Sequence, residues 1–378
     1  MKLPPLGLYI HLPWCEKKCP YCDFNSHAAD AIPEQRYVDR LLDDLRAEEP
    51  LRQGRTINTI FIGGGTPSLF SPEAIARLLE GVADSMPLST TAEITLEANP
   101  GSAESDNFQG FAEGGVTRLS LGIQSFDDSC LDALGRVHDS IQAHAAIRFA
   151  REAGFHSFNI DLMHGLPGQT PEMARSDLAA AIDHAPPHLS WYQLTIEPNT
   201  VFYSRPPTLP GEDNLADIQS AGEALLAEQG YGQYEVSAYS RPGLQCRHNI
   251  NYWHFGDYLG IGAGAHGKVT YGDGRIQRYA KTRQPDAYMA SNADTARADT
   301  HWLDSADIPG EYVMNALRMN EGFSLDAFTA RTGLPEQRLH AQLERLRGKG
   351  LLEVETGRVV TTALGRRFLD SVVTEFLA

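Results

Sequence analysis

The first 200 or so residues alternate short apolar runs with longer stretches that carry apolar residues at helical spacing. Tyr37, Leu41 and Leu45, for example, would share one face of a helix. The apolar runs are short and rich in β-branched and aromatic residues, which is typical of buried strands. Six strands are predicted, over Leu6–Leu12, Ile57–Ile62, Glu93–Ala98, Arg118–Gln124, Ser157–Met163 and Leu189–Ile196. This alternation predicts βαβ units and a parallel sheet.

Six right-handed crossover units curl a parallel sheet toward a barrel, two units short of the eight that close one. We therefore predict an α/β fold whose core is an open (β/α)6 partial barrel. One helix has a clear predicted start, because Ser71 is a good N-cap and Pro72 suits the first helical position.

The chain is predicted to divide into three parts. A Pro-rich stretch, Arg205–Pro210, marks a boundary and is followed by a predicted helix over Asn214–Glu228 and a β-rich section over Tyr231–Ala280. We expect a barrel core over residues 1–205, an α/β extension over 206–300 and a smaller C-terminal α+β domain over 301–378.

The C-terminal part has the element order of a winged helix. We predict two helices, a hairpin that turns at Thr356-Gly357 and a closing helix, over Ser324–Thr332, Pro335–Gly348, Leu351–Thr361 and Ala363–Leu377. DNA binding is the alternative that this order raises, yet the arginines of the second helix are interleaved with glutamates. A structural or docking lid is the favoured interpretation.

The charge balance of the chain argues against several partners. Its 378 residues hold 32 Lys and Arg against 49 Asp and Glu, a formal net charge of −17, while 42% of residues are hydrophobic. A surface of that sign repels phosphate backbones and anionic lipid, so nucleic acid is not expected as a partner. No apolar run reaches the roughly 18 residues of a membrane span, and the start lacks a leader pattern. A soluble, cytoplasmic protein without an integral membrane segment is expected.

Three of the five cysteines form a compact cluster directly after the first predicted strand. Cys15, Cys19 and Cys22 have the spacing C-x3-C-x2-C. An odd number of cysteines, three of them within eight residues, does not suit a disulfide framework. Three thiolates on one loop can hold a metal centre, and they would leave one iron of a [4Fe-4S] cluster without a protein ligand.

Zinc is the alternative at this cluster, with His11 or His27 as a fourth ligand. Structural zinc sites usually use two closely spaced ligand pairs separated by a longer gap, which this loop lacks. Cys130 and Cys246 are expected to be inert thiols.

Polar and glycine residues follow the predicted strands at their carboxyl ends. They are Gly63-Gly64-Gly65-Thr66-Pro67, Glu97-Ala98-Asn99-Pro100, Gln124-Ser125, Asp161 with His164-Gly165, and the region of Gln193 and Glu197. Each group alone could be a turn or a helix cap. Parallel barrels, however, place their chemistry on the loops at this end of the strands, so the five groups together predict one ligand site.

The cysteine spacing after strand one of a partial barrel resembles the hallmark of the radical S-adenosylmethionine (SAM) superfamily. The resemblance implies a [4Fe-4S] cluster on Cys15, Cys19 and Cys22. It further implies that SAM binds exchangeably at the open iron through its methionine moiety, and that the reduced cluster can cleave its sulfonium to a deoxyadenosyl radical.

The strand-end residues resemble the SAM pocket of the coproporphyrinogen-dehydrogenase-like branch of this superfamily. That likeness implies that Tyr9 packs beside the cluster, that Gly64 meets the methionine amino group and that Glu97 holds polar groups of SAM. Further positions that match SAM contacts are Gly65, Thr66, Gln124, Arg136 and Asp161. Arg136 could equally be a surface salt-bridge partner.

Two groups within this branch fit the chain unequally. In the oxygen-independent coproporphyrinogen III oxidases the cluster motif continues to a further cysteine, where this chain has Phe24, and only 14 residues precede Cys15. The segment His248–Trp253, with the pattern HNxxYW, resembles the signature of the haem-chaperone group. That likeness implies a haem site at His248, Tyr252 and Trp253, although the same residues could be core packing.

The function predicted from this resemblance is that of a haem chaperone. It would carry the cluster and SAM, bind haem as cargo and deliver it to acceptor haem proteins, without coproporphyrinogen dehydrogenase activity. The alternative is an oxygen-independent coproporphyrinogen III oxidase. The oligomeric state stays open, with a homodimer among the possibilities.

Overall fold

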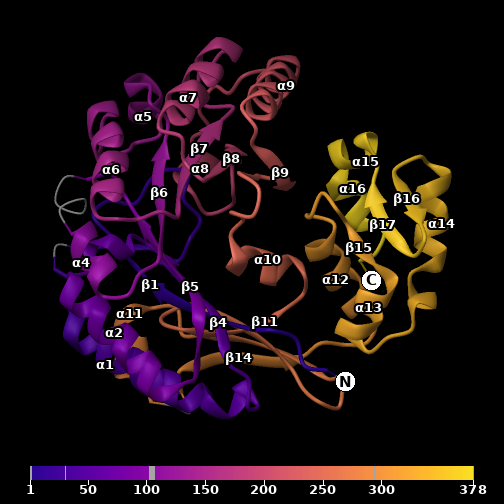
Figure 1. The fold of residues 1–378 in the computed structure, drawn as a ribbon, viewed down its shortest axis with the longest axis horizontal. Helices are drawn as coiled ribbons and strands as arrows, with labels where there is room; N and C mark the ends of the chain where they lie inside the picture. The colour runs from indigo at the N-terminus through magenta and orange to yellow at the C-terminus, as the bar shows by residue number, and fades with distance from the viewer. Residues whose placement is uncertain (1, 30, 102–106, 293–294, 378) are drawn as a thin grey trace.

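The computed structural model describes residues 2–29, 31–101, 107–292 and 295–377. A strongly curved sheet forms most of the molecule and carries helices on its outer side, while a small C-terminal domain lies next to its open side (Figure 1). In the described part of the chain, no helix combines the length and apolar character that crossing a bilayer requires.

The predicted partial barrel is confirmed. Six parallel strands form its wall: β1 Leu6–Leu12, β4 Ile57–Gly64, β5 Leu88–Ala98, β6 Arg118–Gln124, β7 Phe158–His164 and β8 His188–Gln193. The predicted bounds of the first and fourth strands match those observed, and the sixth strand ends at Gln193 instead of Ile196.

Six more strands extend this sheet at both edges. They are β9 Gly232–Glu235, β10 Ala238–Ser240, β11 Asp257–Ile261, β12 His266–Thr270, β13 Ile276–Lys281 and β14 Arg297–Trp302. The strand order is β14-β13-β12-β11-β1-β4-β5-β6-β7-β8-β10-β9. Strand β11 is parallel to β1, with Leu8 opposite Leu259, and the strands outside β11 and β8 are antiparallel. The sequence did not predict that β11 extends the parallel part of the sheet.

Helices cover the outer face of the barrel. In the described part of the chain, the α-helices up to residue 290 are, with α10 on the open side, α1 Glu34–Glu48, α2 Pro72–Ser85, α4 Phe108–Glu113, α5 Asp128–Ala133, α6 Ser140–Glu152, α7 Pro171–Asp183, α8 Val201–Ser204, α9 Glu212–Glu228, α10 Arg247–Trp253 and α11 Pro285–Ala290. Helix α2 begins as predicted, because the Ser71 hydroxyl accepts a hydrogen bond from the Ala74 N–H at 3.3 Å.

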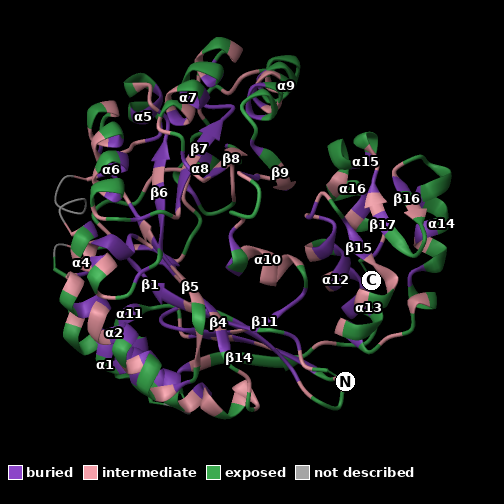
Figure 2. Ribbon diagram, in the orientation of Figure 1, coloured by how far each residue is buried: buried purple, intermediate pink, exposed green. Residues whose placement is uncertain are grey.

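Side chains alternate between the two faces of each strand and so separate the core from the site. On β1, Leu8, Ile10 and Leu12 are fully buried in the core that also contains Tyr37 and Leu41 of α1. Figure 2 shows most strands of the barrel wall buried and the outer faces of the helices exposed, whereas the edge strand β14 is exposed. Each such aliphatic side chain contributes roughly 1.5–3 kcal/mol on burial. The opposite face of the strands turns toward the barrel interior and carries polar residues.

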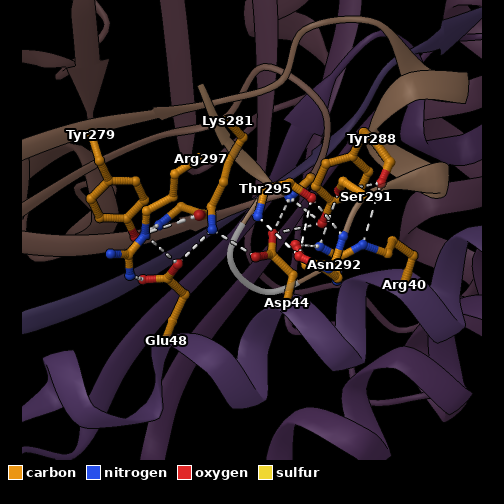
Figure 3. Close-up of polar contacts among 12 residues, drawn as sticks. Arg40, Asp44, Glu48, Tyr279, Lys281, Tyr288, Ser291, Asn292, Thr295 and Arg297 are labelled. Carbon is orange, nitrogen blue, oxygen red and sulfur yellow. Dashed lines mark hydrogen bonds and ion pairs between the residues drawn. The ribbon is translucent and has the colours of Figure 1, made fainter. Parts of the chain in front are cut away.

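A buried ion network fixes α1 to the added strands (Figure 3). The Lys281 ammonium of β13 lies 2.6 Å from Asp44 and also pairs with Glu48, and Arg297 of β14 reaches the other Glu48 oxygen at 2.6 Å. The Tyr288 hydroxyl donates to Asp44 at 2.6 Å. These contacts join the barrel helix to the strands that follow β11.

The C-terminal domain has its own hydrophobic core, in which Val313, Phe328, Leu343 and Val359 are buried. Its elements are α12 Ile308–Ala316, β15 Phe323–Ser324, α13 Leu325–Thr332, α14 His340–Gly348, β16 Leu352–Glu355, β17 Arg358–Thr361, α15 Ala363–Arg367 and α16 Leu369–Thr374. The predicted single closing helix was wrong, because non-helical dihedral angles at Phe368 divide it in two. The domain boundaries at residues 205 and 300 stay a prediction.

Candidate functional site

The three clustered cysteines share one loop and one cavity. Cys15 ends the short strand β2 (Trp14–Cys15), and Cys19 and Cys22 lie on the loop that leads to β3 (His27–Ala28). All three thiols are half-buried and line a cavity of about 310 Å³. The loop is closed by a hydrogen bond from the Cys22 N–H to the Cys19 carbonyl at 3.1 Å.

Asn25 anchors the end of this cluster loop. The side-chain amide of Asn25 donates to the backbone carbonyls of Ala263 and Arg283, at 2.9 Å each. The backbone carbonyl of Asn25 lies 2.9 Å from Nε2 of His11. The other ring nitrogen of His11 lies 2.9 Å from the Tyr9 hydroxyl. The cluster loop is therefore held both by β1 and by the glycine-rich loop after β11.

The surroundings of the thiols suit thiolate ligands. The Thr66 hydroxyl donates to the Cys15 sulfur at 3.5 Å, and the Arg136 guanidinium donates to the Cys19 sulfur at 3.6 Å. Burial raises the pKa of the Cys15 and Cys22 thiols, so a metal that binds them must displace their protons. The positive charge of Arg136 favours the anionic form that a metal needs.

The geometry argues against the zinc alternative. Within residues 2–29, 31–101, 107–292 and 295–377, no three His, Cys, Asp or Glu side chains converge closely enough to share one ion. Both ring nitrogens of His11 are also engaged, with Asn25 and Tyr9. A four-iron cluster takes each thiolate on a different iron and so requires a wider arrangement of sulfurs.

Seven of the eight residues predicted to contact SAM line the same cavity as the cysteines. They are Gly64, Gly65, Thr66, Glu97, Gln124, Arg136 and Asp161. Tyr9 does not line the cavity, and its hydroxyl is bonded to His11. The structure thus brings residues from β4, β5, β6 and β7 together at one end of the barrel. Their roles toward SAM stay predictions.

The backbone at the end of β4 requires glycine. Gly64 has a φ of +120°, a region that side chains other than glycine rarely adopt, and its N–H donates to Glu97 Oε2 at 3.0 Å. A Cβ atom on Gly65 would lie 2.3 Å from the Trp14 carbonyl oxygen. The backbone of β2, which leads into the cluster loop, and the backbone of the glycine segment at the end of β4 are therefore in direct contact.

Two carboxylic acids form the floor of the cavity. Burial, with a smaller contribution from the nearby Asp161, raises the pKa of Glu97 to about 7. Burial also raises the pKa of Asp161, which accepts hydrogen bonds from Ser120 at 3.0 Å and Asn159 at 2.7 Å. A cationic ligand would lower both pKa values, so the floor suits a positively charged group.

Arg136 is a half-buried part of this site, and its predicted contact with SAM stays a prediction. Its guanidinium donates to the Asn99 side-chain oxygen at 2.7 Å and to the Gly122 carbonyl at 2.8 Å, besides Cys19. Among the residues that the structure describes, no carboxylate forms an ion pair with it. Asn99 in turn donates to the Thr66 hydroxyl at 2.9 Å.

Several cavity residues were missed from sequence. Ser120 and Tyr192 line the cavity, whereas the expected Gln193 and Glu197 do not. The Tyr192 hydroxyl donates to Gln124 at 2.8 Å. Strand alternation could have found Ser120 and Tyr192, because each lies an even number of positions from another inward-facing residue of its strand.

The HNxxYW motif forms helix α10, which lies on the open side of the barrel against β1, β4 and α12 (Figure 1). Glu93 of β5 accepts hydrogen bonds from the backbone N–H groups of Arg247 and His248, at 3.2 and 3.0 Å. The motif therefore packs against the starts of the barrel strands, whereas the cluster cavity lies at their ends.

His248 is 0% exposed, and both its ring nitrogens are engaged. Nδ1 lies 2.8 Å from the Thr59 hydroxyl, and Nε2 lies 2.7 Å from the Tyr252 hydroxyl. Burial lowers the pKa of His248 to about 3, so the ring is neutral. In this conformation neither nitrogen is free for iron, and its predicted ligation of haem stays a prediction.

Trp253 is a half-buried aromatic residue of the motif. The Arg318 guanidinium lies over its ring at 4.4 Å, and within the described chain its indole N–H has no hydrogen-bond partner. Tyr252 and Trp253 also line a cavity of about 180 Å³ beside α12.

Comparison with known proteins places the whole chain in one family. It is 51% identical over 379 residues to the haem chaperone HemW of Escherichia coli (strain K12), with all of both chains covered. It is 48% identical to HemW of Haemophilus influenzae, and 35% identical to HemW of Mycobacterium tuberculosis over 99% of this chain and 95% of that one. The chain belongs to the HemW family.

Two domain families and one solved structure agree with membership of the HemW family. The radical SAM superfamily model matches residues 9–180, and the HemN C-terminal domain model matches residues 303–368. The structure of coproporphyrinogen III oxidase (HemN) from Escherichia coli is similar, with a TM-score of 0.84, 25% identity and coverage of 100% of this chain and 91% of that chain. The predicted radical SAM fold is confirmed.

Phe24 occupies the position at which the cluster motif of the oxidases continues to a further cysteine. Its side chain is 61% exposed and lines the mouth of the cluster cavity. In this HemW-family chain, an apolar ring therefore stands where the longer motif has a cysteine.

Proposed function

We propose that this protein is a haem chaperone that binds haem as cargo and delivers it to acceptor haem proteins. The observation that carries the proposal is the identity of 51% to a HemW haem chaperone over the full length of both chains. We further propose that Cys15, Cys19 and Cys22 hold a [4Fe-4S] cluster.

The donor set fits such a cluster with one open iron. Three thiols face one cavity, and neither Cys130 nor Cys246 lines it. A cluster of this kind, when bound, supplies a vacant ligand position for the methionine group of SAM and an electron for cleaving its sulfonium bond. The Arg136 guanidinium would offset the negative charge of the thiolates.

The protein's own groups would bind and orient SAM in the cluster cavity. Gly64 and Gly65 line the cavity with backbone atoms, while Glu97 and Asp161 supply negative charge toward a sulfonium. The proposal assigns Thr66, Gln124 and Arg136 to further polar contacts. Tyr9 would support the cluster side through His11.

A haem site at α10 requires local rearrangement in this proposal. Tyr252 and Trp253 offer flat apolar area, and the neutral ring of His248 is the form that binds iron. Since Thr59 and Tyr252 occupy its two nitrogens, His248 would have to exchange one of these partners for iron.

Coproporphyrinogen III decarboxylation is the second candidate, favoured by the TM-score of 0.84 to HemN. Phe24 at the mouth of the cavity disfavours it, because the longer oxidase motif has a cysteine there.

The two candidates separate in one anaerobic experiment. Reconstituted protein is incubated with SAM, a reductant and coproporphyrinogen III, and a parallel sample is titrated with haem. We expect a haem spectrum that saturates at about one haem per chain, and unchanged coproporphyrinogen III by chromatography. Steady formation of protoporphyrinogen IX would establish the oxidase instead. A variant with Cys15, Cys19 and Cys22 all changed to Ser is the control for cluster-dependent turnover.

A further inference from the structure

A second cavity, of about 550 Å³, lies at the other end of the barrel from the cluster cavity. We call it the basic cavity, and it is formed by Lys2, Leu3 and Pro5 before β1, by Arg55 before β4, and by Ala327 and Arg331 of α13. Figure 1 shows the N-terminus beside α13, so the cavity lies between the barrel and the C-terminal domain. Its volume is in the range of sites for small organic ligands.

The charges in this cavity are unusual for a protein with a net charge of −17. Three cationic side chains line it, and no carboxylate does. Arg55 is already satisfied, because it pairs with Asp257 at 2.6 Å and donates to the Pro4 carbonyl at 3.1 Å. Lys2 and Arg331 carry the charge that remains for a ligand.

Arg331 is the informative residue. It is half-buried, yet the described residues provide its guanidinium with neither a hydrogen bond nor an ion pair. Burial lowers the pKa of Arg331, and the nearby Tyr312 and Asp257 offset this only in part, so the guanidinium has lost water without gaining a direct contact. A partly desolvated guanidinium is stabilised by an anion that fits its planar fork, and a carboxylate does so with two hydrogen bonds.

The other walls of the cavity are apolar. Leu3, Pro4, Pro5, Ala327 and Ala330 contribute aliphatic surface around the cations. A ligand that matches both features has an apolar body and carboxylate groups at one edge. Haem has this form, since its ring is apolar and its two propionates leave from one side.

The basic cavity also adjoins the strands that hold the HNxxYW helix. Asn58, which lines the cavity, precedes Thr59, the hydrogen-bond partner of His248. Leu6, which also lines it, precedes Gly7, where a Cβ atom would lie 3.2 Å from the His248 ring. The cavity and the motif thus lie on neighbouring residues of β1 and β4.

We propose that the basic cavity binds the propionate carboxylates of haem, with Arg331 as the main contact and Lys2 as a second. This inference rests on the proposed function, because it assigns the cargo of that function to a place in the fold. It also gives the cargo a binding contact that does not require His248 to release either of its partners.

The test compares haem with haem dimethyl ester, in which both propionates are blocked. Each is titrated into the full-length, cluster-loaded protein, its Arg331→Gln and Arg331→Lys variants, and Arg175→Gln as a control on the outer helix α7. We expect Arg331→Gln to weaken haem binding about tenfold and to leave ester binding within twofold of the unaltered protein. Arg331→Lys should recover part of the loss, and Arg175→Gln should have no effect.

The variants are compared only where iron content and melting temperature match those of the unaltered protein. Haem binding that is indifferent to Arg331, or an equal loss for haem and for the ester, would overturn the assignment of this cavity. Preferential binding of a short acidic peptide, with no competition from haem, would also overturn it. If the unaltered protein binds no haem, the proposed function itself fails, which is a distinct result.

Discussion

At the scale of single residues, the chemistry of the cluster cavity depends on three thiols that have no fourth cysteine beside them. We predict about four irons per chain in anaerobically purified protein, and loss of the brown colour when Cys15, Cys19 or Cys22 becomes Ser. Iron analysis and absorbance check this. Cys130→Ala and Cys246→Ala should keep the cluster, because both thiols are buried outside the cavity. Stoichiometric zinc without iron after anaerobic reconstitution would contradict the assignment.

Glu97 makes a pH-dependent contribution to stability and to ligand binding. Its folded pKa of about 7 lies above the ordinary glutamate value, so its stabilising effect is present at low pH and is lost as the pH rises toward and through 7. We therefore predict that Glu97→Gln raises the melting temperature of the ligand-free protein more at pH 8 than at pH 5.5, because the stability loss accumulates between the ordinary and the folded pKa. A calorimetric pH series checks this.

The titration of Glu97 should affect SAM affinity and protein stability in opposite directions as the pH rises. Above pH 7 the anionic Glu97 attracts the sulfonium, so SAM affinity of the unaltered protein should rise through this range. In Glu97→Gln the affinity should be lower at pH 8 and nearly independent of pH. Parallel pH profiles for the two proteins would show that Glu97 does not contact the ligand.

Site residues that belong to a sequence motif could be predicted from the sequence. Contacts that depend on how distant segments pack together could not. The strand ends identified six of the seven predicted cavity residues because barrel loops converge by topology, whereas Arg136 came only from the family resemblance. Asn99 was within a recognised segment, but its bridge between Arg136 and Thr66 depends on the segments after β4 and α5 both reaching the end of β5. The motif around His248 gave no sign that both its nitrogens are engaged.

At the scale of elements, α10 depends on His248 as a structural residue. We predict that His248→Ala lowers the free energy of unfolding by about 2–4 kcal/mol, because the hydroxyls of Thr59 and Tyr252 lose a buried partner. Urea unfolding of the cluster-free chain measures this. Tyr252→Phe removes only one of these bonds and should cost about 1 kcal/mol. An unaffected midpoint for His248→Ala would mean that the ring does not support the helix.

Strands of the barrel wall were predictable because they are buried on their outer face and bounded by turn residues. Strand β11 was harder, since it is short and begins with the buried Asp257, which pairs with Lys268 at 2.9 Å. The closing helix was mispredicted because helical spacing continues through Phe368 although the backbone does not. Local pattern thus predicts an element's existence better than its ends.

At the scale of the whole molecule, the Lys281 network joins the barrel to the strands that extend it (Figure 3). Lys281→Met would leave Asp44 and Glu48 buried with less positive charge, so we predict a loss of about 3–5 kcal/mol in unfolding free energy. Arg46→Met is the matched control, because it removes only the exposed pair with Asp43 and should cost less than about 1 kcal/mol. Equal effects of the two substitutions on the urea midpoint would contradict this role.

The central claim is that this molecule carries haem and releases it to another protein. Haem transfer from the loaded, gel-filtered protein to apomyoglobin tests it most directly, because the myoglobin spectrum reports each haem that arrives. The account predicts retention of about one haem per chain through gel filtration, followed by complete transfer once the acceptor is added in excess. A chain that loses all haem during gel filtration, or that keeps it in the presence of excess apomyoglobin, would contradict the account.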